Sequence, residues 1–207
     1  MNHFDRVYYI NLPHRKDRLE HIQAQLASMD VDPDKIVRVE GVYMKGFGPL
    51  GCSKSHILAL EHFLASPPEN RTCVIFEDDF QLNIPPSQVN DILTSVFRDL
   101  EHFDVLMLSA NVQREEPCPF PFLFKTLNAQ TTSGYAVSRD FAPTLLENYR
   151  EGAKRMEKAG RKVEALCLDM YMKRLQPVST WYHVKPRIGK QMQSFSDIEN
   201  RVVNYGV

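Results

Sequence analysis

The sequence predicts an α/β domain with a mainly parallel sheet. In the first half of the chain, short runs of β-branched and aromatic residues alternate with segments of helical periodicity, in the order strand, helix, strand, helix, strand. Parallel strands need helical crossovers, and this alternation supplies them. The chain has 207 residues, of which 43% are hydrophobic, so a single domain over residues 1–207 is expected.

The first predicted strand spans residues 7–12, and Pro13 ends it. The helix after it has an apolar stripe of Leu19, Ile22 and Leu26. Arg15 and Arg18 lie on one face of the first turn of this helix, where cations are disfavoured. Two interpretations stay open: both arginines are solvated, or a bound anion such as a phosphate relieves the conflict.

Residues 36–42 form the second predicted strand, which a glycine-rich loop follows. This loop fits neither GxGxxG nor the Walker pattern, so no phosphate-binding motif is assigned to it. The next helix is predicted to begin at Ser53 as its N-cap. His56 then lies in its first turn, either as a hydrogen-bonded packing residue or as a functional group beside the loop.

The third predicted strand, residues 73–79, ends in the consecutive acids Glu77, Asp78 and Asp79. Burying unpaired charge is costly, so the strand must emerge at Glu77 and carry the acids to solvent, a ligand or a metal. Strand tips of α/β sheets bind ligands, and carboxylates suit a hard divalent cation. The alternative is an acidic turn that merely ends the strand.

The second half of the chain contains further strands and helices. The predicted order is a helix at 85–100, a strand at 103–108, a loop and candidate lid at 113–121, strands at 122–125 and 133–138, a helix at 139–149, a charged solvated segment at 151–162, a helix at 165–175, a strand at 180–184 and a polar tail at 185–207 that wraps the site or the surface. Asp169 is a single acid on an otherwise apolar helical segment, so it either faces a cleft or pairs with Lys173 one turn away.

Composition restricts the classes of partner. The net charge is -1, with 25 basic and 26 acidic residues, so no global field favours nucleic acid. The four cysteines form no CxxC motif, which weakly favours a reducing compartment. No signal-peptide pattern and no apolar run of membrane-spanning length occurs, so we expect a soluble, cytoplasmic protein, with peripheral membrane association left open.

Together these segments resemble glycosyltransferase family 25, which includes lipopolysaccharide and procollagen galactosyltransferases. The segments that carry the resemblance are Ile10-Asn11-Leu12 with Arg15 and Arg18, Gly51-Cys52 with Ser55-His56, the strand ending in Glu77-Asp78-Asp79, the Thr132 to Ser138 region, Asp169 within a helix, and a weaker tail match at Pro186, Gln191, Ser196, Asp197 and Ile198. The chain is short for the family, and residues 113–122 match no family motif.

The resemblance implies an A-type glycosyltransferase fold, which is Rossmann-like with helices on both faces of the sheet. It also implies a nucleotide-sugar half at about 1–110 and an acceptor half at about 111–207. The implied reaction moves a hexose such as galactose from a nucleotide-diphosphate donor, most often a UDP-sugar, to a glycan or glycoprotein acceptor with inversion. Two alternatives are an inert nucleotide- or sugar-binding module and a metal-dependent phosphohydrolase or nucleotidyltransferase.

The resemblance also suggests roles for individual residues. Asp79 and Glu77 are expected to hold Mn2+ or Mg2+ at an acid-x-acid pattern, and Asp169 is expected to be the catalytic base. The expected donor-binding residues are Asn11, Arg15, Arg18, Ser53, Ser55, His56, Glu77, Asp78 and Gln191. Gln191, His183 and Asp197 are expected to close over the diphosphate or the metal.

Overall fold

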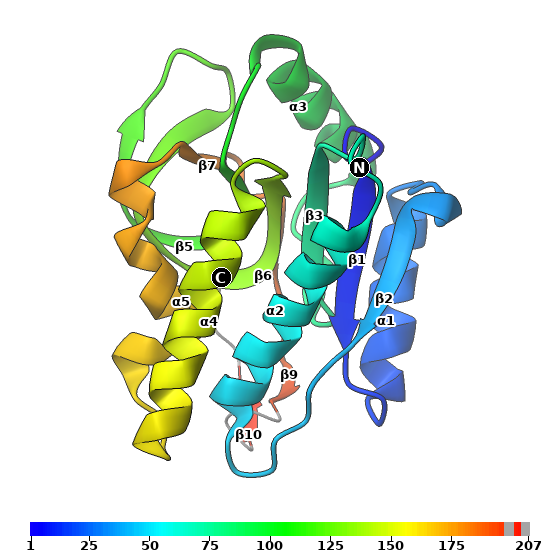
Figure 1. The fold of residues 1–207 in the computed structure, drawn as a ribbon. Helices are drawn as coiled ribbons and strands as arrows, with labels where there is room; N and C mark the ends of the chain where they lie inside the picture. Colours follow the sequence, from blue (N-terminus) through cyan, green and yellow to red (C-terminus); the bar gives the residue numbers. More distant parts are fainter. Residues whose placement is uncertain (197–200, 204–207) are drawn as a thin grey trace.

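The computed structural model describes residues 1–196 and 201–203, which fold around a six-stranded sheet (Figure 1). Its strands lie in the order β2 (Ile36–Glu40), β1 (Arg6–Asn11), β3 (Thr72–Glu77), β6 (Leu123–Ser138), β5 (Val105–Pro117) and β7 (Trp181–Val184). β1 is parallel to both of its neighbours and β5 is parallel to β7, whereas β6 is antiparallel to β3 and β5. The prediction of an α/β fold with a mainly parallel sheet is confirmed.

Helices cover both faces of the sheet. They are α1 (Lys16–Ser28), α2 (Gly48–Ala65), α3 (Pro86–Asp99), α4 (Ala142–Ala159) and the short α5 (Leu168–Tyr171). α1 and α3 share one core cluster with Val74 and Phe76 of β3. α2 and α4 lie side by side on the other face (Figure 1), in a second cluster with Cys73 and Ile75. Successive side chains of a strand face opposite sides, so β3 supplies both cores.

The strand β3 surfaces where the sequence predicted. The residues from Cys73 to Phe76 are fully buried, and Glu77 is the first partly exposed one after them. Asp78 and Asp79 are nevertheless only 6% and 7% exposed. The two aspartates are therefore held by protein contacts rather than by solvent, since Arg18 lies within ion-pair distance of both carboxylates.

β5 and β6 form one long hairpin, where the sequence predicts shorter strands and a loop. The segment 113–121 was predicted as a loop, but β5 continues to Pro117 and pairs with the start of β6. The predicted strands 122–125 and 133–138 are the two ends of β6. The register of the pair shifts at several positions, which accommodates the polar residues in the middle of the hairpin. The first residues of β6 also pair with β7.

Several helix boundaries also differ from the prediction. α2 begins at Gly48, and Ser53 lies inside it with its hydroxyl donating to the Pro49 carbonyl, so Ser53 is not the N-cap. α4 extends through most of the charged segment to Ala159 and closes at Gly160, whose φ of 64° is left-handed. The segment 165–175 is a broken helix in which α5 lies between the 3-10 turns Glu164–Leu166 and Met172–Arg174.

The tail returns to the acidic strand tip. After the 3-10 turn Gln176–Val178 and β7, β8 (Gly189–Gln191) pairs with β4 (Phe80–Leu82), and β9 (Ser194–Ser196) pairs with β10 (Arg201–Val203). The Met192 amide donates to the Asp79 carbonyl at 2.7 Å. The tail therefore wraps the site as predicted, although Asp197 and Ile198 lie outside the described residues. None of the helices in the described part of the chain has the length and apolarity to span a bilayer.

Candidate functional site

The candidate site lies where β1 and β3 end side by side. In their parallel register Ile10 is opposite Glu77, so Asn11 lies next to Asp78. The Asn11 side-chain amide donates to Asp78 Oδ2 at 2.7 Å. Arg18 donates to Asp78 Oδ1 at 2.9 Å and lies 3.2 Å from Asp79 Oδ2. The structure thus brings predicted basic and acidic residues together at one edge of the sheet.

Asn11 is held entirely by protein partners. Its side chain also donates to the Arg15 carbonyl at 3.1 Å, and its Oδ1 accepts from Arg38 at 2.7 Å. Because Asn11 is only 1% exposed, its contact with a donor stays a prediction, and its visible role is to position Asp78. Sequence reasoning missed Arg38, whose only signal is a lone arginine in the strand beside β1.

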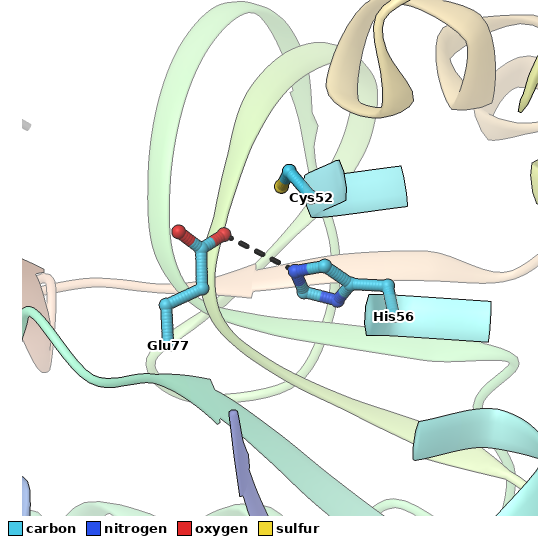
Figure 2. A group of neighbouring side chains, drawn as sticks. All are labelled: Cys52, His56 and Glu77. Atoms are coloured by element: carbon cyan, nitrogen blue, oxygen red, sulfur yellow. Dashed lines mark hydrogen bonds and ion pairs between the residues drawn. The ribbon is translucent and has the colours of Figure 1, made fainter. Parts of the chain in front are cut away.

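Glu77 is held by two side chains from other elements, Thr132 of β6 and His56 of α2. Its Oε1 accepts from the Thr132 hydroxyl at 2.7 Å and lies 3.3 Å from His56 Nε2 (Figure 2). Burial alone would raise the pKa of Glu77, but His56 and Thr132 favour the ionised form and bring the pKa below its ordinary value. The other ring nitrogen of His56 contacts the Tyr135 hydroxyl at 3.1 Å. Glu77 is therefore a fixed, ionised carboxylate.

Asp79 has the opposite environment. Burial first, and then repulsion from Glu77, raise its pKa to about 7. Its Oδ1 is buried and, within the part of the chain that the structure describes, has no hydrogen-bond partner. A buried acceptor without a donor is costly, and a bound cation would compensate it. A carboxylate oxygen of this kind suits a hard divalent cation, and a site for Mn2+ or Mg2+ at Asp79 and Glu77 stays a prediction.

A second candidate metal group shares Glu77. Cys52 and His56 project from the same side of α2 toward Glu77 (Figure 2). The ligand atoms of these residues lie within 4.8 Å of one another. The Cys52–His56 spacing of four residues was readable in the sequence, but the approach of Glu77 depends on how α2 packs on the sheet.

Two adjoining cavities open beside the acids. The smaller, about 110 Å3, is lined by Arg18, Ser55, His56, the three acids and the apolar residues Ile10, Leu12, Val42, Tyr43 and Met44. The larger, about 210 Å3, is lined by Asp169 and by polar residues that include Asn111, Gln130, Thr131 and Thr132. Cys52, Glu77 and Gln191 line both cavities. Of the three acids, only Glu77 lines both cavities, and the smaller cavity combines an apolar wall with the charged groups of the site.

Asp169 faces the larger cavity. Burial raises its pKa above the ordinary value, although the Thr131 amide donates to its Oδ2 at 3.4 Å and lowers the pKa in part. The alternative partner Lys173 donates instead to Gln130 at 2.9 Å and to Gln113 at 3.3 Å. Of the two sequence interpretations, the structure supports the one in which Asp169 faces a cleft.

Three predicted residues lie elsewhere. Arg15 binds Asp17 with two hydrogen bonds of 3.0 and 2.8 Å, and Ser53 is 1% exposed inside α2. Neither belongs to the described residues that line the two cavities. His183 contacts Thr126 at 2.9 Å and Glu115 at 2.8 Å beside a separate cavity of about 330 Å3. The expectation that His183 closes over the acids is wrong, because β7 carries His183 and is separated in the sheet from β3 by β6 and β5.

Comparison with known proteins supports the fold. No protein-family model matches the chain, and no curated protein matches it significantly. A glycosyltransferase involved in the glycosylation of the major capsid of PBCV-1 superposes with a TM-score of 0.53 at 12% identity, over 94% of this chain and 96% of that one. A mannose-1-phosphate geranyltransferase from Thermus thermophilus gives a TM-score of 0.49 at 10% identity, over 96% of this chain and 76% of that one. At 12% identity the likeness to the first of these concerns the fold alone, and the protein has the Rossmann-like A-type architecture that it shares with that glycosyltransferase.

Proposed function

We propose that this protein is a metal-dependent glycosyltransferase that moves a hexose such as galactose from a UDP-sugar to a glycan or glycoprotein hydroxyl, with inversion. The observation that carries the proposal is the pair of cavities that adjoin at Glu77, one with an apolar wall beside charged groups and one lined mainly by polar residues. A nucleotide sugar likewise has two chemically different ends, a planar base and a hydroxyl-rich sugar ring. The motif resemblance to family 25 and the shared fold agree with it.

The smaller cavity suits the nucleotide. Its apolar and aromatic wall offers a surface for a planar base, and Arg18 offers a guanidinium for a phosphate oxygen. Arg18 now pairs with Asp78 and Asp79, so it is already held at the junction of the two cavities. Arg18 is therefore not simply solvated, and its contact with a phosphate oxygen is part of this proposal.

Asp79 and Glu77 would hold the divalent cation, which would offset the charge that develops on the departing diphosphate. Without such an ion, the three carboxylates at the end of β3 would repel the donor. Asp78 accepts hydrogen bonds from Asn11 and Arg18, so in this proposal it serves to orient the cluster.

Asp169 is the proposed general base. In the transfer the acceptor oxygen forms a bond to the anomeric carbon, the bond from that carbon to the diphosphate breaks, and the acceptor proton passes to a carboxylate. Asp169 lines the polar cavity, and its raised pKa makes it a better proton acceptor than an ordinary aspartate. The Thr131 amide fixes its orientation.

The product of donor turnover tests this function against its alternatives. The full chain is incubated with UDP-galactose or UDP-glucose and Mn2+, with an EDTA-treated sample as control, and the products are separated by chromatography. Free UDP with released or transferred sugar, formed only with the metal, is the expected result. Release of inorganic phosphate or pyrophosphate would overturn the assignment in favour of a phosphohydrolase or nucleotidyltransferase. Donor binding without any product would favour an inert binding module.

A further inference from the structure

The helix α2 and the tip of β3 present three potential metal ligands that the proposed transfer does not use as a set. Cys52 offers a thiol, His56 an imidazole nitrogen and Glu77 a carboxylate, and these atoms lie within 4.8 Å of one another. Figure 2 shows the three side chains converging on one small volume. Cys52 and His56 are four residues apart on a helix and so share one face.

We propose that Cys52, His56 and Glu77 form a binding site for a thiophilic divalent cation such as Zn2+. Thiolate, imidazole and carboxylate are the ligand types that zinc combines, whereas Mg2+ and Mn2+ prefer oxygen alone. This donor set therefore differs in chemistry from the carboxylate pair of Asp79 and Glu77. The thiol proton is released to solvent when the cation binds.

The distance between the histidine and glutamate ligand atoms agrees with a tetrahedral centre. With zinc bonds of about 2.0 Å to nitrogen and oxygen, two ligands at tetrahedral positions are separated by about 3.3 Å. His56 Nε2 and Glu77 Oε1 lie 3.3 Å apart. The widest separation in the group is at most 4.8 Å, so binding draws the ligands inward by a side-chain adjustment rather than a change of fold.

The surroundings supply the supporting contacts that such sites need. A ligating histidine is oriented by a partner on its other ring nitrogen, and here Nδ1 of His56 contacts the Tyr135 hydroxyl at 3.1 Å. The Thr132 hydroxyl donates to the Glu77 carboxylate at 2.7 Å. Cys52 and Glu77 line both cavities, which gives a cation access and leaves a fourth position open to water or a ligand.

Cobalt absorption tests the site without any donor or acceptor, so its outcome is independent of the proposed glycosyl transfer. The full chain, kept reduced with a non-thiol reductant, is titrated with Co2+. We expect one equivalent to give the intense visible bands of a tetrahedral ion together with a thiolate-to-cobalt charge-transfer band, and Zn2+ to bleach both. Weak octahedral absorption alone would overturn the proposal.

Matched variants identify the ligands. Cys52→Ala should abolish the charge-transfer band, and Glu77→Gln should weaken Co2+ binding at least about tenfold. Cys118→Ala, which changes a cysteine that bonds to the Leu123 carbonyl, should leave the spectrum unchanged. Persistence of the band in Cys52→Ala, or its loss in Cys118→Ala, would contradict the assignment.

Alkylation of the unmodified protein keeps the test decisive if a variant fails to fold. Zn2+ should protect Cys52 from iodoacetamide at least about tenfold more than it protects Cys118, as read by peptide mass spectrometry, because a bound thiolate is withdrawn from reaction. Equal alkylation of Cys52 with and without Zn2+ would overturn the site.

Discussion

At the scale of single residues, the site contains three carboxylates with different proton affinities, of which Asp79 is buried and Glu77 and Asp169 are partly buried. Hydrogen bonds from His56 and Thr132 keep the pKa of Glu77 low, whereas burial raises the pKa values of Asp79 and Asp169. Such separation allows one acid to stay charged while another exchanges a proton. The division agrees with Glu77 as a permanent ligand and Asp169 as the base.

The pH dependence of turnover tests the role of Asp169. A base must be deprotonated to work, so kcat for UDP formation should be low at acid pH and rise as Asp169 loses its proton. Because burial raises its pKa, this rise should lie above the ordinary range of an aspartate. The measurement is a pH profile of kcat at saturating donor and metal.

Asp169→Asn is the matching variant. It should lower kcat by about 100-fold or more and remove the acidic limb, while the affinity for UDP measured by titration stays close to that of the unchanged protein. A variant that retains both kcat and the acidic limb would exclude Asp169 as the base.

Thr132→Val tests whether the hydroxyl on β6 supports metal binding. Valine has the shape of threonine but cannot donate to Glu77, so the carboxylate loses its 2.7 Å hydrogen bond. We expect about tenfold weaker activation by Mn2+, seen as a higher metal concentration at half-maximal rate, with little change in folding. Thr126→Val, on the same strand but bonded to His183, should leave metal activation unchanged.

Some of these residues were predictable and others were not. A run of acids after a buried strand can be recognised in the sequence as the point where the strand leaves the core, because unpaired charge is too costly to bury. Arg38 contacts Asn11 and Thr132 contacts Glu77 only because strands that are distant in sequence lie close in the fold, so no local pattern indicates these two residues. The burial of Asp78 likewise depends on Arg18, which lies 60 positions away.

At the scale of secondary-structure elements, the pairing of β8 with β4 brings Gln191 to the cleft. The fit depends on Gly189, because a Cβ there would lie 2.0 Å from the ring of Phe80. That ring is fully buried, its centroid lies 4.5 Å from that of Phe76, and a Cβ at Gly134 would also clash with it. The ring therefore has no room to yield, and any side chain at position 189 must displace β8.

Gly189→Ala should accordingly affect both stability and activity. We expect a loss of about 1–3 kcal/mol in the free energy of unfolding, measured with urea, and a clear fall in UDP formation as β8 moves. Gly160→Ala is the control, because φ there is 64° but no atom lies near the added Cβ. It should cost about 1 kcal/mol through backbone strain alone and leave turnover unchanged. Equal effects of both variants on turnover would contradict the role given to β8.

The elements that sequence reasoning missed share a physical cause. Residues 113–117 are charged and end in proline, which favours a loop, yet they continue β5 because the partner strand β6 supplies their backbone hydrogen bonds. The start of α2 at Gly48 was missed for a related reason. Glycine has a low helix propensity, so the local sequence does not indicate that the helix begins there. The alternating strands and helices of the first half were predictable because their periodicity is local.

At the scale of the whole molecule, the parallel sheet gathers groups from distant parts of the chain at one edge. β1 and β3 contribute the acids and their partners, α2 contributes His56, and the returning tail contributes Gln191. In an open α/β sheet, the carboxyl ends of parallel strands are where ligands bind. The smaller cavity on one side of Glu77 and the larger cavity on the other make this edge suited to join two substrates.

The charge of this edge makes a prediction about how donor and metal bind together. UDP carries a diphosphate, which Asp78, Asp79 and Glu77 repel, while Mn2+ attracts both sides. Mn2+ and UDP together should therefore raise the midpoint of thermal unfolding by more than the sum of their separate shifts, since each ligand increases the affinity for the other. Differential scanning fluorimetry of the full chain with each ligand alone and with both measures this excess. Asp79→Asn should reduce the excess to near zero, because it removes the carboxylate whose buried oxygen lacks a partner among the described residues. An excess that survives this substitution unchanged would mean that the cation bridging the donor is held by other groups.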